Sequence, residues 1–273
     1  MSPQQNIRQK TDMATAVLAL VDIMQTLRDP EHGCPWDIEQ THESIVPYTI
    51  EEAYEVADAV AKGNPDDIRD ELGDLLLQIV FQSQIASEGG RFDLTDVANS
   101  ICQKMINRHP HIFTANAVDD AAAVREQWED IKSRERASKG ETRKLDGIAT
   151  TLPAVMQALK LQNRAARVGF DWPDARSVLD KMREETQELE DEINAASPNP
   201  SALEDECGDI LFVAVNLARK LGVDPEQALA STNRKFRKRF NHIEDQANNQ
   251  NMSLNECSLD DMEQWWQNAK TLP

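Results

Sequence analysis

Glu184-Glu185-Thr186-Gln187-Glu188 and the downstream Glu206-Cys207-Gly208-Asp209 form an acidic pattern that the chain contains twice. The earlier copy reads Glu51-Glu52-Ala53-Tyr54-Glu55, followed by Glu71-Leu72-Gly73-Asp74. The two copies of the first motif lie 133 positions apart, and those of the second lie 135 positions apart. A repeat of this length predicts two domains rather than a solenoid, whose repeats span about 20–50 residues.

Composition predicts an all-α protein. The 273 residues suffice for two domains of about 130 residues, each able to bury its own core. Aromatic residues make up only 5%, and good helix formers fill most segments. Residues 133–151 are polar and lack a sustained apolar stripe. We therefore expect tandem repeated helical-bundle domains at 1–135 and 151–273, joined by a linker at 136–150.

The strong negative charge limits the classes of partner. With 48 acidic against 29 basic residues, the net charge is −19 at pH 7. Such a surface repels nucleic-acid backbones and anionic membranes, so we expect neither a nucleic-acid polymer nor a membrane as partner. A small polyphosphate remains compatible with it, because divalent cations can bridge carboxylate to phosphate.

Cysteine usage and hydropathy predict a soluble cytoplasmic protein. Cys34, Cys102, Cys207 and Cys257 lie far apart and form no Cys-x-x-Cys pair, so neither a disulfide framework nor a zinc ribbon is expected. Residues 1–11 are polar and lack the apolar core of a signal peptide. No apolar run approaches the roughly 20 residues of a membrane span.

Helix start and stop signals recur in both halves. After a helix near residues 12–28, the stretch 28–47 is typical of an irregular connection, and Thr49 with Glu52 is a candidate capping box. The further signals are starts at Asn64-Pro65, Asp93, Asp174, Ser201 with Glu204, and Asp224-Pro225, and stops at Gly89-Gly90 and Gly222. Together they predict two helical hairpins in each half.

The acidic residues lie where apolar residues are expected. Val178, Met182, Glu185 and Leu189 follow helical spacing, which puts Glu185 on the stripe that faces the core. Glu206 stands between Leu203 and Ile210 on the stripe of the next helix, and Glu71 stands likewise between Ile68 and Leu75. Both halves therefore point carboxylates inward.

Inward carboxylates indicate a cation site. Burying them without partners costs several kcal/mol, so a hard divalent cation, Mg²⁺ or Mn²⁺, is expected to compensate them. The candidate ligands are Glu185, Glu188, Glu206 and Asp209 in the second half and Glu52, Glu55, Glu71 and Asp74 in the first. Acid pairs that merely decorate solvated helices are the alternative. A di-iron bundle is disfavoured, because only Glu39-x-x-His42 matches its Glu-x-x-His motif.

A cationic patch accompanies the acids. Lys235 and Arg239 lie one turn apart within a basic run, and Lys104 and Arg108 repeat this spacing 131 positions earlier. Beside a metal site such a pair favours polyphosphate binding. A solvated basic face paired with neighbouring acids is the alternative.

Three further residues bear on the nucleotide and on which half is active. One indole of Trp265-Trp266 could stack on a base while the other packs, although core packing alone is the simpler role of each. Asn216 lies seven residues after Asp209 and could hydrogen-bond a base or sugar, whereas the first half has Phe81 at the matching offset. We therefore favour the second half as the main catalytic one.

The chain resembles the MazG family of nucleoside triphosphate pyrophosphohydrolases, within the all-α pyrophosphatase superfamily. Six motifs carry the resemblance, in order along nearly the whole chain: Cys34-Pro35-Trp36-Asp37, Tyr48-Thr49-Ile50-Glu51-Glu52, Glu71-Leu72-Gly73-Asp74-Leu75, Arg108-His109-Pro110-His111, Val168-Gly169-Phe170-Asp171-Trp172 and Glu206-Cys207-Gly208-Asp209-Ile210. Several such motifs in one order are highly specific, whereas a lone Glu-Glu-x-x-Glu is weak.

The resemblance implies hydrolysis of nucleoside and deoxynucleoside triphosphates between the α and β phosphates, and a homodimer. It further implies that Mg²⁺ is held by the four second-half acids, that Lys235 and Arg239 contact phosphates, and that Trp266 closes on the nucleotide. A pyrophosphatase restricted to one nucleotide shares every motif and stays open as an alternative. A non-enzymatic acidic scaffold accounts for the charge but not for duplicated inward acids.

Overall fold

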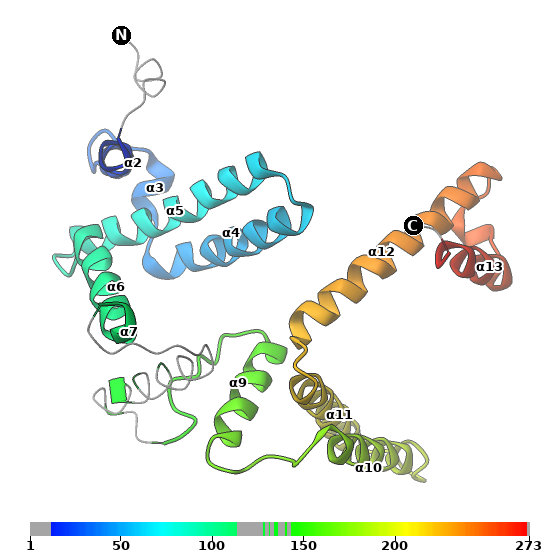
Figure 1. The fold of residues 1–273 in the computed structure, drawn as a ribbon. Helices are drawn as coiled ribbons and strands as arrows, with labels where there is room; N and C mark the ends of the chain where they lie inside the picture. Colours follow the sequence, from blue (N-terminus) through cyan, green and yellow to red (C-terminus); the bar gives the residue numbers. More distant parts are fainter. Residues whose placement is uncertain are drawn as a thin grey trace. The chain divides into compact units, whose positions relative to one another are not determined.

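The computed structural model describes residues 12–113, 128, 131, 134–135, 140 and 143–271. The regular elements among these residues are helices, which confirms the all-α prediction (Figure 1). The chain divides into two compact units, Met1–Lys132 and Ser133–Pro273. The expected linker at 136–150 begins just after this division, and its residues 136–139 and 141–142 lie outside the described residues.

The first unit is built around one long helical hairpin. Its described helices are α2 (Met13–Leu27), α3 (Pro35–Glu39), α4 (His42–Lys62), α5 (Pro65–Glu88), α6 (Leu94–Arg108) and α7 (Pro110–Phe113). Helix α5 packs along α4, and it also contacts α2 and α6. The core cluster of Met24, Ile45, Val80, Phe81 and Ile85 joins α2, α4 and α5.

The second unit repeats the hairpin and adds a long helix. Its described helices are α9 (Ala154–Ala166), α10 (Ala175–Ile193), α11 (Pro200–Lys220), α12 (Pro225–Asn249), the short 3₁₀ helix η1 (Leu254–Glu256) and α13 (Leu259–Ala269). Helices α10 and α11 form the hairpin, α9 packs on α11 and α12, and α13 packs on α12. Figure 1 shows α12 running from the end of α11 toward α13. Ile243, Ala247 and Trp265 form the core between α12 and α13.

Most predicted helix starts are confirmed at the level of single hydrogen bonds. The side chains of Asn64, Asp93, Asp174 and Asp224 each accept a hydrogen bond from a backbone N–H in the first turn of their helix. These bonds satisfy donors that the helix itself leaves unpaired. Each of these bonds joins residues within one helical turn, so the helix start can be predicted from the sequence alone.

Two predicted starts are wrong. Helix α4 begins at His42, where Thr41 and Ser44 form a capping box, and Pro47 lies inside the helix. A proline there removes one N–H and one helical bond, but the box and the burial of Ile45 hold the first turn in place. Helix α11 begins at Pro200 with Asn199 as its N-cap, rather than at Ser201.

An ion-pair network anchors the loop before α10 to the end of α11. Asp171 accepts hydrogen bonds from Arg219 Nη2 and, at 2.6 Å, from Lys220 Nζ. Arg219 Nη2 also donates to Asn216 Oδ1 at 2.8 Å. Burial alone would raise the pKa of Asp171, but the hydrogen bonds and charges of Arg219 and Lys220 outweigh it and lower the pKa. The ionised Asp171 therefore stabilises the folded second unit.

We expect Asp171→Asn to lower the free energy of unfolding of the second unit by about 1–2 kcal/mol, because two largely buried cations lose their counter-charge. The loss should be greatest at neutral pH and vanish as the pH falls below the lowered pKa of Asp171, where the native side chain is also neutral. Urea unfolding at several pH values measures it. Asp180→Asn, which removes an exposed ion pair with Arg183, is the matched control and should change stability little.

Candidate metal and nucleotide site

The second unit brings three predicted ligands together between α10 and α11. One carboxylate oxygen each of Glu185, Glu188 and Glu206 lies within 4.8 Å of the others. Glu185 is only 4% exposed, Glu206 is half-buried and Glu188 is exposed. The group therefore combines a buried carboxylate with one that is open to solvent, so a metal ion held here would also be accessible to a substrate or water ligand.

Contacts within and beside this group shift the pKa values of Glu188 and Lys181. A hydrogen bond with Glu185, then partial burial and the charges of Glu185 and Glu206, raise the pKa of Glu188. On the other side, Lys181 Nζ contacts Glu184 Oε1 at 2.6 Å and Glu185 Oε1 at 2.7 Å. Hydrogen bonds to Glu184 and Glu185 raise the pKa of Lys181, so its ammonium stays charged. The sequence analysis did not single out Lys181, although its position one turn before Glu185 was a readable signal.

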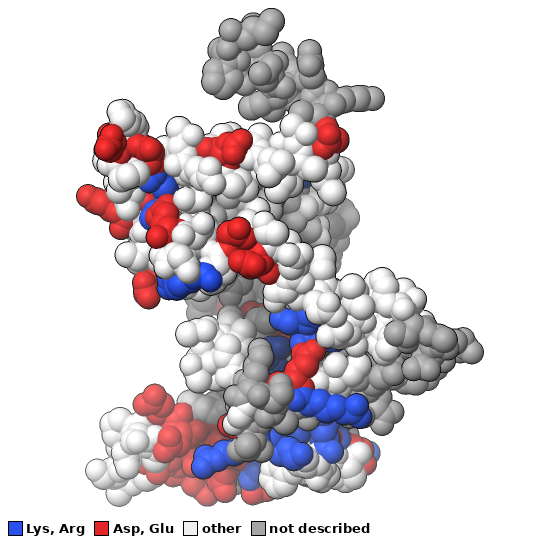
Figure 2. Space-filling model, turned by 90° about the vertical axis from the view of Figure 1, so that its left-hand side faces the viewer, with Lys and Arg blue, Asp and Glu red and all other residues white. Residues whose placement is uncertain are grey.

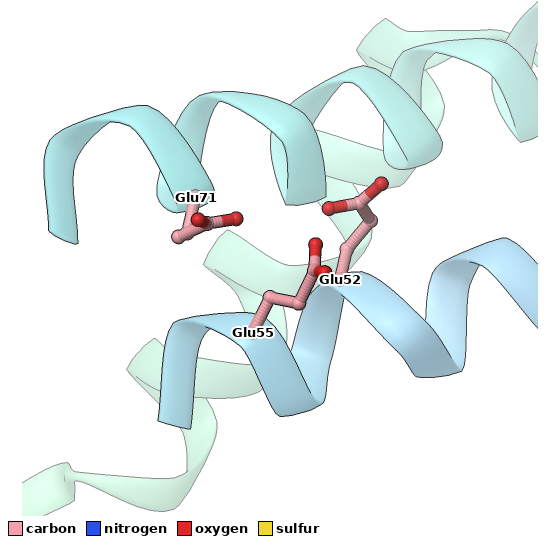
Figure 3. Close-up of side chains that lie close together, drawn as sticks. All are labelled: Glu52, Glu55 and Glu71. Atoms are coloured by element: carbon pink, nitrogen blue, oxygen red, sulfur yellow. The ribbon is translucent and has the colours of Figure 1, made fainter. Parts of the chain in front are cut away.

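The first unit contains a matching group. Glu52 and Glu55 from α4 and Glu71 from α5 point into the space between the two helices, with oxygens within 4.8 Å of one another (Figure 3). Burial, then the charges of Asp74 and Glu55, raises the pKa of Glu52. Burial and the charges of Glu55 and Asp74 likewise raise the pKa of Glu71. Glu52 Oε2 is buried without a hydrogen-bond partner in the described structure.

Asp74 and Asp209 lie outside these two groups. Each is exposed and stands one turn after Glu71 or Glu206 on the same helix. Asp74 still acts on Glu52 and Glu71 through its charge, so it borders the first group. Neither carboxylate belongs to the set of oxygens that lie within 4.8 Å of one another.

Both acidic groups fit a hard divalent cation. Their donors are all carboxylate oxygens, which Mg²⁺ and Mn²⁺ prefer over nitrogen or sulfur ligands. Burial raises the pKa of Glu52 and Glu71 and a hydrogen bond with Glu185 raises that of Glu188, and in all three the charges of neighbouring carboxylates add a repulsion that a cation would relieve. The unpartnered Glu52 Oε2 supplies a free ligand atom.

The cationic and aromatic residues gather on α12 and α13. Arg239 Cζ lies 5.4 Å from the ring centroid of Trp266, and the Phe236 ring lies 5.2 Å from the same indole. Phe236 also stacks on Phe240 at 6.1 Å, and Lys235 is exposed. The two phenylalanines were missed from sequence, although their spacing of one turn inside the basic run was visible. The arrangement presents a charged and aromatic face.

The two tryptophans differ in burial, and Asn216 is buried. Trp265 is buried against Ile243 and Ala247, while Trp266 is only partly buried. Asn216 is 2% exposed, and its Oδ1 accepts from Arg219. Its amide therefore supports the Asp171 network rather than lying open to a base. The matching Phe81 is also buried, in the core of the first unit.

Charged side chains of both signs lie on the face of the molecule seen in Figure 2, and acidic and basic ones adjoin one another in several places. In the part of the chain that the structure describes, no helix combines the length and apolar character that crossing a membrane requires. The four cysteines, all within described segments, are free.

Two helical hairpins, each with a group of three glutamates, define an all-α protein with an acidic group in each unit. A model of the MazG nucleotide pyrophosphohydrolase domain matches residues 40–113 and 174–244, once in each unit. The chain is 47% identical over 251 residues to a nucleoside triphosphate pyrophosphohydrolase of Escherichia coli strain K12, an alignment that covers 92% of this chain and 95% of that protein. It is 43% identical to the nucleoside triphosphate pyrophosphohydrolase/pyrophosphatase MazG of Thermotoga maritima, covering 92% and 94%. The chain belongs to the MazG nucleotide pyrophosphohydrolase family.

Protons and divalent cations should compete for the two acidic groups. We expect the rise in unfolding temperature caused by Mn²⁺ to shrink as the pH falls from about 7 to about 5, because carboxyls with raised pKa values are protonated first. Protonation also relieves their repulsion, so the metal-free protein is not destabilised by it over this range. Thermal unfolding with and without Mn²⁺ measures the difference. An equal Mn²⁺ effect at both pH values would contradict the assignment of these carboxylates as ligands.

Proposed function

We propose that this protein hydrolyses nucleoside and deoxynucleoside triphosphates between the α and β phosphates in a Mg²⁺-dependent reaction. The products are the nucleoside monophosphate and pyrophosphate. The observation that carries the proposal is the group of Glu185, Glu188 and Glu206, with oxygens within 4.8 Å of one another in a member of this family. The names of the two relatives support the same reaction.

Glu185, Glu188 and Glu206 are the proposed ligands of Mg²⁺ in the second unit, with Asp209 completing the set. In the first unit the corresponding residues are Glu52, Glu55, Glu71 and Asp74. Mn²⁺ suits the same oxygen ligands. When bound, the metal neutralises the triphosphate and lowers the pKa of a bound water.

The remaining chemistry belongs to side chains of the chain. Glu188 is exposed, so it is placed to orient the attacking water or to accept its proton. Lys235 and Arg239 supply positive charge for the phosphate oxygens, which bear more negative charge in the transition state. Trp266, held beside Arg239, offers an indole face to the base.

The site is proposed to be completed in a homodimer. The acidic group lies between α10 and α11, whereas α12, which carries the basic residues, packs chiefly on α13 and α9. A groove of about 550 Å³ runs between α9, α11 and α12 and is lined by apolar side chains, including Val155, Phe212 and Leu229. Leu211, on the same groove, is 67% exposed. A second copy of the chain would bury this face.

We expect Glu206→Gln to abolish pyrophosphate release while leaving helicity intact, because it removes the α11 ligand and keeps the side-chain volume. Glu71→Gln, its counterpart in the first unit, should cost much less, since the second half is proposed as the main catalytic one. The measurement is product analysis with each common nucleoside triphosphate, with and without Mg²⁺, resolving pyrophosphate from orthophosphate.

Several results would contradict this assignment. Retained turnover in Glu206→Gln would remove the metal-site assignment, and a greater loss in Glu71→Gln would reverse the choice of half. Release of orthophosphate with a diphosphate would overturn α–β cleavage. Turnover of a single nucleotide would favour the pyrophosphatase of narrow specificity.

For the homodimer, we expect Leu211→Asp to convert the dimer to a monomer, because a carboxylate would be buried in an apolar interface. Light scattering coupled to gel filtration measures the mass. Leu259→Asp, at a 77% exposed position outside the groove, is the matched control and should stay dimeric. A wild-type protein with the mass of one chain would exclude the proposed dimer.

A further inference from the structure

Lys181 is a cation placed within the acidic group of the second unit. It lies on α10 one turn before Glu185, and its Nζ is 2.6 Å from Glu184 Oε1 and 2.7 Å from Glu185 Oε1. Its side chain is 30% exposed, whereas that of Glu185 is 5% exposed. The ammonium thus reaches a buried carboxylate from the open side of the group.

The buried carboxylate needs such a partner when no metal is bound. Glu185 lies within reach of Glu188 and Glu206, and three like charges this close repel one another strongly. A hydrogen bond between Glu185 and Glu188 relieves part of the repulsion. The ion pair with Lys181 relieves another part, and it does so at the residue that is farthest from water.

The first unit has no lysine at the corresponding position. Tyr48, 133 positions before Lys181, occupies it, and its ring makes an edge-to-face contact with Trp36 at 5.7 Å. A tyrosine brings no positive charge to Glu52, whose Oε2 is buried without a partner in the described structure. The two acidic groups are therefore built alike but compensated differently.

We propose that Lys181 is a counter-cation that forms an ion pair with Glu185 in the metal-free protein, and that this ion pair breaks when a divalent cation binds. Glu184, which is exposed, keeps the ammonium after the exchange, because Lys181 contacts both carboxylates at once. Two consequences follow for the second unit. Its metal-free hairpin is stabilised, and its affinity for metal is lowered, because the incoming cation has to replace an existing ion pair. This inference rests on the metal site of the proposed function, but not on turnover.

The test measures Mn²⁺ binding to the full chain, using the electron paramagnetic resonance signal of free Mn²⁺. Glu71→Gln is introduced first, so that the group of the second unit is observed alone. In this background Lys181→Met should lower the dissociation constant for Mn²⁺ about three- to tenfold, which corresponds to the loss of one partly exposed ion pair. Arg183→Gln removes the same charge from the same helix at a position paired with Asp180, and should change the constant less than about twofold.

Metal-free stability provides a second readout. Without added metal, Lys181→Met should lower the unfolding temperature of the second unit by about 2–4 °C, and saturating Mn²⁺ should restore it. In the reciprocal Glu206→Gln background, which leaves the first unit's group to be observed, Lys181→Met should not change Mn²⁺ binding. A change there as large as in the Glu71→Gln background would overturn the local role of Lys181.

Glu184→Gln tests the exchange between the two carboxylates. Its effect on Mn²⁺ binding should be larger in the presence of Lys181 than in the Lys181→Met background, because only then does it remove the alternative partner. Equal effects in both backgrounds would exclude the exchange. Equal Mn²⁺ affinity in Lys181→Met and Arg183→Gln would overturn the proposed role of Lys181 as a counter-cation. Absence of pyrophosphate release with intact Mn²⁺ binding would instead contradict the proposed reaction alone.

Discussion

Repulsion between carboxylates on the inner faces of two paired helices is the constraint on which the structure depends. Each hairpin places three glutamates with oxygens within 4.8 Å of one another, and Glu185, Glu206 and Glu71 among them stand on helix stripes that otherwise hold apolar residues. Burial together with this repulsion raises the pKa of Glu52 and Glu71, and a hydrogen bond with Glu185 together with burial and repulsion raises the pKa of Glu188. The hairpins tolerate it because their other stripe residues, such as Val178 and Val80, are fully buried. The free energy gained by burying these apolar side chains thus offsets the repulsion among the glutamates.

The two units meet this constraint in different ways. Glu52 and Glu55 share a hydrogen bond, as Glu185 and Glu188 do, but in the second unit Lys181 also pairs with the buried Glu185. In the first unit Glu52 Oε2 stays without a partner, and aromatic packing of Tyr48 takes the place of the lysine. A duplicated pattern has therefore produced two groups with the same ligands and different surroundings. Affinity for a cation depends on those surroundings as much as on the ligands themselves.

Local chemistry explains which predictions were confirmed. Asn64, Asp93 and Asp224 start helices by accepting hydrogen bonds within the first turn, an interaction that needs no distant residue. Pro47 misled the sequence analysis because a proline usually ends or begins a helix, yet Thr41, Ser44 and the buried Ile45 hold the preceding turn. Asn216 was singled out for the ligand, but it is buried and its Oδ1 accepts a hydrogen bond from Arg219 on the same helix, because the packing around α11 covers a position that periodicity alone does not show to be covered.

The sequence alone determined the helical class, the duplication and the inward direction of Glu185, because each of these follows from composition, spacing or helical periodicity, and its motifs carried the family resemblance. Only the tertiary structure decided that Glu185, Glu188 and Glu206 meet without Asp209, that Lys181 reaches Glu185, and that Arg239 lies over Trp266. Periodicity assigns a residue to one face of its own helix. The rotation and depth at which two helices pack decide which side chains come within bonding distance, and packing sets these across the whole interface.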